Sequence, residues 1–559
     1  MTAMPSRVHY IIYMVSLPNR RKHPFMTLKA SILSLLLFCL STVTLSAQWE
    51  ARPELPWNVE EDTCGVFVYP RTRYVDVMLS TEASLGSGCY SPYYLVSNRH
   101  GLIDERANTG YLRADVKGLL SRGDWTFTSE LDLLASAHAY SQLRLHQLYA
   151  TLSWRYRLNL TVGAREQGPV LRDFRLSSGS MVWSGNARPI PQVHLGTNSF
   201  LPLHFTNDWL EVFCDMHYGR YLDDDYLEEE YAQYVADKTG YGRSWVTTHV
   251  WSHQKRGYLR TNSHKPWVFT LGGEHAVQFG GNIRSSLDPE LADAQYPPSF
   301  TDFLRVLVPV EGGSNATGGD QNFKYGNHIG IISALLEYQW GPGRQHKVGI
   351  YGEDLFEDGS GIRKCNGWDG LWGIEYHNRD PYALFKGIVL EYLQTTDQSG
   401  PIHWAPDDFS GQTVATVMPH EATGMDDYYN NFFYTGYTHF GMACGTPMLK
   451  SPAFNDDHYL RFTDNRVRAW HLGLEGNLSG IDARLSALDY RILFSHRQSY
   501  GTYFFPHPEV YSSTDALIEF SWRHDRWNFS AGYAFDRGEL YGDNHAVSLK
   551  ASYRFSVYP

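Results

Sequence analysis

Residue types that recognise sugars gather in three stretches of this 559-residue chain. Residues 177–193 read SSGSMVWSGNARPIPQV, residues 424–431 read GMDDYYNN, and residues 445–452 read GTPMLKSP. An aromatic face can stack on a sugar ring, while amides, carboxylates and guanidinium groups can hydrogen-bond hydroxyls or acidic sugars. The candidate polysaccharide-binding residues are therefore Trp183, Asn186, Arg188, Asp426, Asp427, Tyr428, Tyr429, Asn430 and Asn431. The alternative is that these residues pack loops against one another.

Tyr428 and Tyr429 are the first candidates, because Asp and Asn residues flank them on both sides. Successive residues of an extended chain point in opposite directions, so we expect only one of the two rings to stack on a sugar. Pro189 and Pro191 exclude a central strand in the earlier stretch, since proline cannot donate to a ladder. We therefore expect this stretch in a loop. The stretch at 424–431 is also expected in a loop, because it lies in a predicted long connection.

Signatures of catalysis are largely missing from the sequence. It contains no His-Glu-x-x-His motif, no Gly-x-Ser-x-Gly elbow and no P-loop, and its 24 His are scattered. The acidic run at 223–230 could hold a divalent cation, but it lacks the spacing of an EF-hand and equally suits a solvated loop or short helix. We predict no enzyme activity, no cofactor and no metal site.

The N-terminus has the order of a secretory signal peptide. An apolar run at 28–45 follows Arg20, Arg21 and Lys22, and it ends in the small residues Ser46 and Ala47. A single transmembrane anchor is the alternative, but the run is shorter than the roughly 20 residues that a spanning helix needs. We predict a cleaved signal over 1–47, with Met26 as an alternative start.

The composition of the remaining chain favours an outer-membrane protein over a nucleic-acid-binding one. A formal net charge of −12 offers no basic patch for nucleic acid. Aromatic residues make up 15% of the chain, 38 of them Tyr, yet no long apolar stretch follows the signal. Strands that face lipid on one side and water on the other have this composition, although soluble β-sandwiches also alternate. Cys64 and Cys89 are the only close cysteine pair, and their pairing is open.

Alternation with a period of two predicts the strands. At the C-terminus Val547, Leu549 and Phe555 point one way, while Lys550 and Arg554 point the other. Charged residues on one face and apolar residues ending in aromatics on the other suit a lumen and a lipid surface. The same pattern recurs at 125–133, 158–165, 515–523 and 527–536.

The lengths of the connections predict the orientation. Short turns at 122–124, 155–157, 477–480 and 524–526 alternate with long connections at 167–188, 221–242, 281–327, 398–465 and 495–514. Outer-membrane barrels have short periplasmic turns and long extracellular loops, and counting back from the last strand gives about eighteen strands. We predict an all-β fold: a transmembrane antiparallel β-barrel over 106–559. Residues 48–105 then form a periplasmic or lumenal segment that could include the first strand.

Four stretches together resemble a known family. SPYYLVSNRHGLI (91–103), SSGSMVWSGNARPIPQV, the block from GMDDYYNN to GTPMLKSP, and TDNRVRAWHLGLEG (463–476) look like the Wzi-type capsule assembly family, in its Bacteroidetes-style branch. The resemblance covers most of the mature chain. It implies an eighteen-stranded outer-membrane barrel with helical elements near its N-terminus, and a lectin-like, non-enzymatic role in holding capsular polysaccharide at the cell surface. It does not supply the sugar-contact residues.

Three functions compete on the sequence alone. The favoured one is a Gram-negative outer-membrane protein that binds capsular or other surface polysaccharide and helps to assemble or retain the capsule. Its partners would be that polysaccharide, outer-membrane lipid and lipopolysaccharide, and possible export machinery. The alternative is a diffusion channel or transporter for sugars, since a barrel of this size could leave an aqueous lumen. An outer-membrane hydrolase is the third, and it would need a positioned nucleophile and base.

Overall fold

The computed structural model describes residues 73–237, 245–285, 294–310, 312–313, 324–357, 359–398, 426–431, 433–503 and 505–557. The chain divides into two units, Met1–Pro56 with Val557–Pro559 and Trp57–Ser556, and all described residues except Val557 belong to the second. The expected signal peptide and Cys64 lie outside the described residues.

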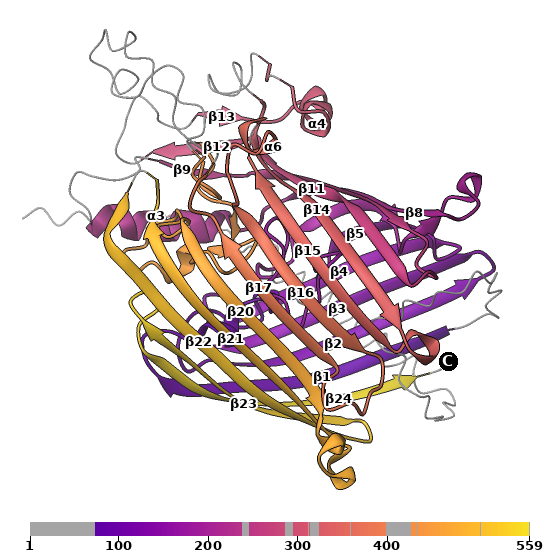
Figure 1. Cartoon of the computed structure of the whole chain (residues 1–559). Coiled ribbons are helices and arrows are strands. Elements are labelled where there is room, and N and C mark those ends of the chain that lie inside the picture. Colours follow the sequence, from indigo (N-terminus) through magenta and orange to yellow (C-terminus); the bar gives the residue numbers. More distant parts are fainter. Residues whose placement is uncertain are drawn as a thin grey trace, which may run out of the picture. The chain divides into compact units, whose positions relative to one another are not determined.

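Eighteen antiparallel strands form a closed barrel (Figure 1). Each strand pairs with the next one along the barrel, and β24 pairs back with β1. The two-residue strand β7 continues β6, because both pair with β8. The strands are β1 (Arg73–Ser87), β2 (Gly110–Arg122), β3 (Trp125–Ala137), β4 (Leu143–Trp154), β5 (Leu158–Ala164), β6 (Pro191–Thr197) with β7 (Leu201–Pro202), β8 (Leu210–Arg220), β10 (Trp251–Thr261), β11 (Trp267–Phe279), β14 (Asn327–Trp340), β15 (His346–Phe356), β16 (Gly370–Asn378), β17 (Gly387–Gln394), β20 (Val467–Asn477), β21 (Leu488–Gly501), β22 (Pro506–His524), β23 (Trp527–Gly538) and β24 (Asn544–Val557).

The remaining elements are short and lie in the connections. They are the helices α2 (Tyr93–Val96), α3 (Asp224–Asp237), α4 (Phe300–Leu307) and α6 (Gly359–Ile362), and the strands β9 (Trp245–Thr248), β12 (Gly281–Ser285), β13 (Gln295–Tyr296), β18 (Thr438–His439) and β19 (Met442–Ala443). Single 3-10 turns occur at His204–Thr206, Pro342–Arg344, Pro452–Phe454, Leu478–Gly480 and Ala483–Leu485. Among the described residues, no helix has the length and apolar character needed to cross a membrane.

The predicted alternation is confirmed. Along β24, Val547 and Leu549 are 49% and 61% exposed, while Ser548 between them is 5% exposed and faces the lumen. Large apolar side chains stay exposed on the outer face of other strands in the same way, which is the pattern of a wall in contact with lipid. Trp527 stacks near Phe529 and Tyr553 on that face, with ring centroids 5.5 and 4.8 Å apart.

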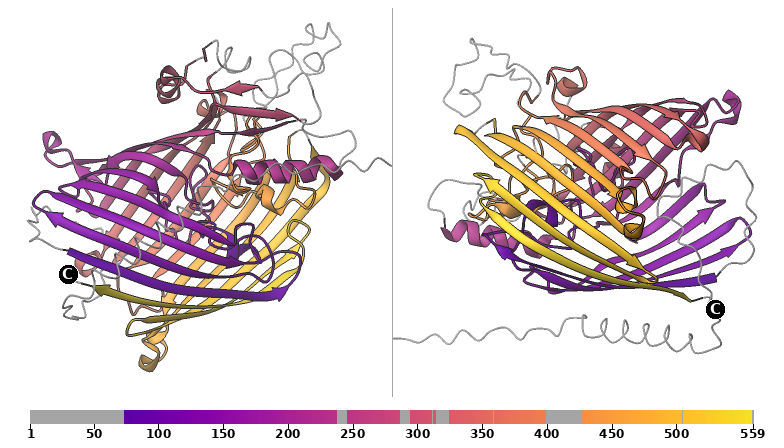
Figure 2. Two further views of the ribbon diagram at one scale, coloured as in Figure 1. Left: turned by 180° about the vertical axis from the view of Figure 1, so that it is seen from behind. Right: turned by 60° about the horizontal axis from the view of Figure 1, so that its bottom comes forward.

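The longest connections all lie at one end of the barrel, as predicted, and the two-residue and three-residue turns lie at the other. We call these the loop end and the turn end. Short connections at 123–124, 155–157 and 525–526 lie at the turn end. Long ones leave the loop end, where α3 also lies (Figures 1 and 2). They span 88–109, 165–190, 221–250, 280–326 and 395–466.

One predicted loop is wrong. Residues 495–514 were expected to form a long connection, but β21 and β22 run through them and only 502–505 connect the two. The polar residues there belong to the inner face. Ser495 Oγ donates to Asp515 and Ser499 Oγ donates to Asp464, at 3.1 and 2.8 Å. Serine and arginine in this segment therefore marked a lumen-facing side of two long strands.

The first strand, left open by the sequence, is β1. It lies inside the segment 48–105, so the barrel includes residues before 106. Its eleven-residue ladder with β2 joins Arg73 to Leu120 and Ala83 to Gly110. The short helix α2 follows β1 directly and enters the lumen with the connection 88–109.

Leu549→Lys tests the assignment of the outer face. A Lys at the lipid midplane costs roughly 2–4 kcal/mol, so the variant should assemble far less folded barrel than Ser552→Asp, whose side chain faces the lumen. The measurement is the fraction of heat-modifiable protein in the outer membrane on gels. Equal losses in the two variants would contradict the assigned faces of β24.

Candidate functional site

Three connections from the loop end pack together inside the barrel (Figures 1 and 2). We call residues 88–109, 165–190 and 426–466 the plug, masked positions excepted. Its apolar core is rich in tyrosine and lies among lumen-facing strand residues. The plug members of this core include Tyr93, Tyr94, Leu176, Met181, Trp183, Tyr428, Tyr429, Tyr434, Tyr437, Met448, Phe454 and Phe462.

Carboxylates of the wall hold the plug backbone. Glu391 of β17 accepts hydrogen bonds from Ser177 Oγ at 2.6 Å and Ser178 N at 2.7 Å. Glu353 of β15 accepts one from Met181 N at 2.9 Å. Hydrogen bonds to a charged acceptor are about twice as strong as neutral ones, and these are shielded from water. The segment 177–181 is therefore fixed to two strands of the wall.

A second set of polar contacts fixes α2. Both carboxylate oxygens of Asp536 in β23 accept the Tyr93 N–H at 3.0 Å. Arg497 of β21 is fully buried, pairs with Asp515 at 2.6 Å, and places its guanidinium 3.9 Å from the centre of the Tyr93 ring. Tyr94 Oη is 2.8 Å from His471 Nδ1, and His471 Nε2 is 2.6 Å from the Leu176 carbonyl oxygen. One histidine of β20 thus joins two plug segments.

Two small cavities lie beside the plug. A cavity of about 30 Å³ lies between α2 and residues 174–178, and one of about 20 Å³ lies between Asp223 and Gly436. A single water needs roughly 10–15 Å³ on this scale, so these cavities hold water but no sugar ring.

The structure places Tyr428 and Tyr429 in the interior of the plug, with no exposed surface. Tyr429 Oη donates to the Met181 carbonyl and accepts Thr446 N–H at 3.0 Å. Tyr428 Oη accepts from Asn366 Nδ2 at 3.3 Å. Burial raises the pKa of both phenols well above the usual value. The sugar-stacking role expected of one ring needs an exposed face, and neither ring has one, so that expectation is corrected.

Their neighbours also hold loops together. Asn430 Nδ2 donates to the Phe462 carbonyl at 2.9 Å, and Asn465 Nδ2 donates to Asp427 Oδ1 at 2.6 Å. Asn431 Nδ2 donates to Asn327 Oδ1 at 3.0 Å. Asp426 is half-buried at the start of this segment. Burial raises the pKa of Asp427.

The candidate residues from the stretch 177–193 pack against the segment 426–466. Asn186, fully buried, donates to the Ala443 carbonyl at 3.0 Å and accepts the Asn98 N–H at 3.1 Å. Arg188 pairs with Asp104 at 3.1 Å and lies 4.1 Å from the centre of the Phe440 ring. Trp183 is 6% exposed. The structure therefore brings the predicted stretches together, but as packing partners.

The acidic run forms the start of α3, which borders the loop end of the plug. Glu230 lies 2.7 Å from His458 Nδ1, Glu228 pairs with Arg284 at 3.0 Å, and Tyr140 Oη donates to Glu229 at 3.1 Å. Asp223 just before the helix is buried, accepts the Phe440 N–H at 2.9 Å, and has its pKa raised to about 7 by that burial. Among the described residues, the α3 carboxylates do not converge as a ligand set for a cation.

Half-exposed aromatic rings lie beside α3, which sequence reasoning missed. Tyr140 packs edge-on against Tyr226 with centroids 5.0 Å apart, and Tyr459 lies 5.3 Å from Tyr234. We define the rim as Tyr140, Glu229, Glu230, His458 and Tyr459. It combines partly exposed rings with carboxylates and an imidazole, the groups that stack on sugars and bond their hydroxyls. Tyr140 and Tyr459 are 319 positions apart in the sequence, so no local motif could have predicted that they lie at the same site.

A closed barrel with an apolar outer wall, a polar inner wall and a plugged lumen defines a transmembrane β-barrel of the outer-membrane type. No family model and no curated protein matches the chain. Among solved structures, it is similar to Wzi of Escherichia coli, described as an outer-membrane protein involved in group 1 capsule assembly and a carbohydrate-binding β-barrel. That similarity has 10% identity, covers 86% of this chain and 84% of that one, and has a TM-score of 0.49.

Structures of Pseudomonas aeruginosa proteins match to a comparable extent. OprD has 11% identity over 88% of this chain and 98% of its own, with a TM-score of 0.41. OpdQ has 10% identity over 87% and 98%, with a TM-score of 0.43. These likenesses concern the barrel fold and do not choose between functions.

Tyr428→Ala combined with Tyr429→Ala tests the packing role. Removing a buried aromatic ring costs about 3–5 kcal/mol, so the plug of this variant should open more often while the lipid-facing wall stays intact. Limited trypsin digestion at Lys450 or Arg461 should become faster, with heat-modifiable migration retained. Phe505→Ala, at an exposed loop-end position, is the matched control and should digest like wild type. Unchanged digestion of the double variant would contradict the assigned role.

Proposed function

We propose that this protein binds surface polysaccharide at the outer membrane and helps to retain or assemble a capsule, acting without catalysis. The observation that carries the proposal is the filled lumen. Two of the plug segments are tied to the wall through Glu353, Glu391 and Asp536, and the third through Asp464, which accepts a hydrogen bond from Ser499 of β21 at 2.8 Å. A barrel whose interior is occupied in this way acts through its surface.

These hydrogen bonds make it costly for the plug to leave the lumen. Withdrawing residues 177–181 would remove the Ser177 and Ser178 donors from Glu391 and the Met181 donor from Glu353, and both carboxylates are buried. Leaving a buried polar group without a hydrogen bond costs about 1–3 kcal/mol. Sugars passing through the lumen would require several such losses at once, which argues against the channel alternative.

The rim is the part of the loop end best suited to the proposed ligand. Its two half-exposed tyrosines offer ring faces, and Glu229 is exposed beside Tyr140. The loop end is the cell exterior if the rule on connection lengths holds, because extracellular loops are the long ones. The sequence resemblance to capsule assembly proteins points to the same class of ligand.

Conductance in planar bilayers tests the plug. Purified wild-type protein should give no stable open steps, whereas Glu353→Ala with Glu391→Ala should give intermittent openings because it removes the acceptors of residues 177–181. The lumen-facing substitution Ser548→Ala on β24, away from these ties, is the control and should stay closed. Steady wild-type conductance that sugars block would establish the channel instead.

Tyr140→Ala combined with Tyr459→Ala tests the rim. Loss of two stacking faces, each worth roughly 1 kcal/mol in aromatic contacts, should weaken polysaccharide binding by about tenfold or more and release capsule into the medium. Purified-protein binding to capsular polysaccharide is measured alongside membrane abundance, which should not change. The control is Phe205→Ala, exposed at the turn end. Wild-type binding by the double variant would exclude the rim as the binding surface.

A further inference from the structure

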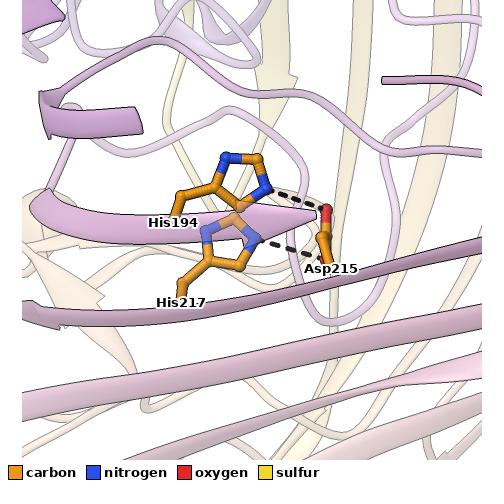
Figure 3. Close-up of side chains that lie close together, drawn as sticks. All are labelled: His194, Asp215 and His217. Atoms are coloured by element: carbon orange, nitrogen blue, oxygen red, sulfur yellow. Dashed lines mark ion pairs between the residues drawn. The ribbon is translucent and has the colours of Figure 1, made fainter. Parts of the chain in front are cut away.

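Two histidines and an aspartate meet on the inner wall of the barrel, away from the rim. His194 is on β6, and Asp215 and His217 are on β8 (Figure 3). His217 Nε2 lies 3.3 Å from Asp215 Oδ1, and His194 Nε2 lies 3.6 Å from Asp215 Oδ2. The two imidazole rings stack with centroids 4.2 Å apart, and both direct a nitrogen toward the carboxylate. The three residues are 7%, 6% and 1% exposed in chain order.

The strand register brings the three side chains to one point. His194 is the direct cross-strand partner of His217, and Asp215 lies two residues before His217 on the same face. The partner of Asp215 is Gly196, which has no side chain to compete for the space. A Cβ at position 196 would lie 2.3 Å from the Asp215 Cβ, so only glycine lets the carboxylate occupy this place.

Three of the four imidazole nitrogens lack hydrogen-bond partners among the described residues. Both ring nitrogens of His194 and Nε2 of His217 are buried without a partner among the described residues. The contacts of His194 and His217 with Asp215 are therefore close approaches without hydrogen-bond geometry. A buried polar atom without a partner costs about 1–3 kcal/mol, so three at one point need an explanation. Lone pairs converging beside a carboxylate are what a metal ion would satisfy.

We propose that His194, Asp215 and His217 bind a divalent transition-metal ion of the zinc class. Two imidazole nitrogens and one carboxylate oxygen form a common zinc ligand set, with the fourth position left to water. Metal–ligand bonds of about 2.0–2.2 Å in a tetrahedron put neighbouring ligand atoms ~3.4 Å apart. His217 Nε2 lies 3.3 Å from Asp215 Oδ1 and His194 Nε2 lies 3.6 Å from Oδ2, and the three residues offer ligand atoms within 4.8 Å of one another. Binding an ion then requires the two imidazole nitrogens to converge on one oxygen of this carboxylate.

Groups around the three ligands suit this role. Arg256 of β10 donates to both oxygens of Asp215, at 3.0 Å from Nε and 2.5 Å from Nη2, and so orients the carboxylate from behind. The Gln167 amide lies 3.5 Å from Nδ1 of His217, the nitrogen that does not face Asp215. Partners in these positions are typical of the shell around metal ligands.

A second group of three possible metal ligands in the barrel is already held together by ion pairs. Asp132, His146 and Glu166 also lie within ligand distance of one another. There Arg113 already bridges Asp132 and Glu166 at 2.7 and 3.0 Å, and His146 Nε2 is 2.8 Å from Glu166. The space between the carboxylates is taken by a guanidinium of the protein itself. This trio is an ion-pair network and serves as the control.

An ion held by the first trio would fasten the plug to the wall. It would join β8 to β6, the strand into which the segment 165–190 leads. Arg256, which orients Asp215, also donates from Nη1 to the Gly168 carbonyl at 3.3 Å. An ion bound by the trio would therefore also restrain the first residues of this plug segment, through Arg256 and Gln167.

The test uses the full-length barrel purified in detergent, stripped with a chelator and titrated with Co²⁺ and Zn²⁺. Wild type should bind about one equivalent, the number expected of a single closed ligand set, with visible absorption bands of tetrahedral cobalt. Zn²⁺ should displace the cobalt and raise the melting temperature, since an ion that binds only the folded state stabilises it. His194→Asn with His217→Asn should weaken Co²⁺ binding at least tenfold.

His146→Asn in the second trio and His204→Ala at the turn end are the matched controls, and both should bind cobalt like wild type. Heat-modifiable migration confirms that each variant remains a barrel, and the wild-type melting shift does not depend on any variant folding. The proposal is overturned if wild type takes up no cobalt and shows no shift with Zn²⁺. It is equally overturned if the controls lose the cobalt bands together with the double variant. Polysaccharide binding at the rim is a separate measurement, so the two proposals fail independently.

Discussion

Charge buried inside the barrel is the constraint on which the rest of the structure depends. Glu353, Glu391 and Asp536 point into the lumen and are cut off from water by the plug. A buried carboxylate is costly unless donors surround it, and here those donors include backbone N–H groups and hydroxyls of the plug. Wall and plug therefore stabilise each other: the strands supply acceptors, and the loops supply the donors that make the strands' charges tolerable.

Tyrosine side chains connect the polar inner wall of the barrel with the apolar core of the plug. The ring packs in the plug core, while the hydroxyl reaches a polar group. Tyr437 Oη donates to the Val182 carbonyl at 2.9 Å, and Tyr351 on the wall donates to Glu391 at 2.5 Å. The abundance of tyrosine thus follows from filling a polar tube with folded loops. With the interior used for packing, the half-exposed rings beside α3 are left as the surface for ligands.

The same period of two that sorts lipid-facing from lumen-facing residues also assembles the trio of His194, Asp215 and His217. Asp-x-His on β8 places a carboxylate and an imidazole on one face, and the register with β6 adds the second imidazole. Neither segment alone resembles a metal motif. The three side chains meet only through the pairing of β6 with β8, which could not be read from the sequence.

The sequence by itself determined the barrel, because alternation is a local property that each strand carries in its own residues. It also determined the two ends, since connection length is counted along the chain, and it singled out the stretches that meet in the plug. It misjudged 495–514, where polar residues faced the lumen and not a loop. Only the tertiary structure decided that Tyr428, Tyr429, Trp183 and Arg188 are interior: exposure depends on which distant segments cover a residue. The composition of a sugar site and that of a hydrogen-bonded loop contact are the same, and burial alone separates them.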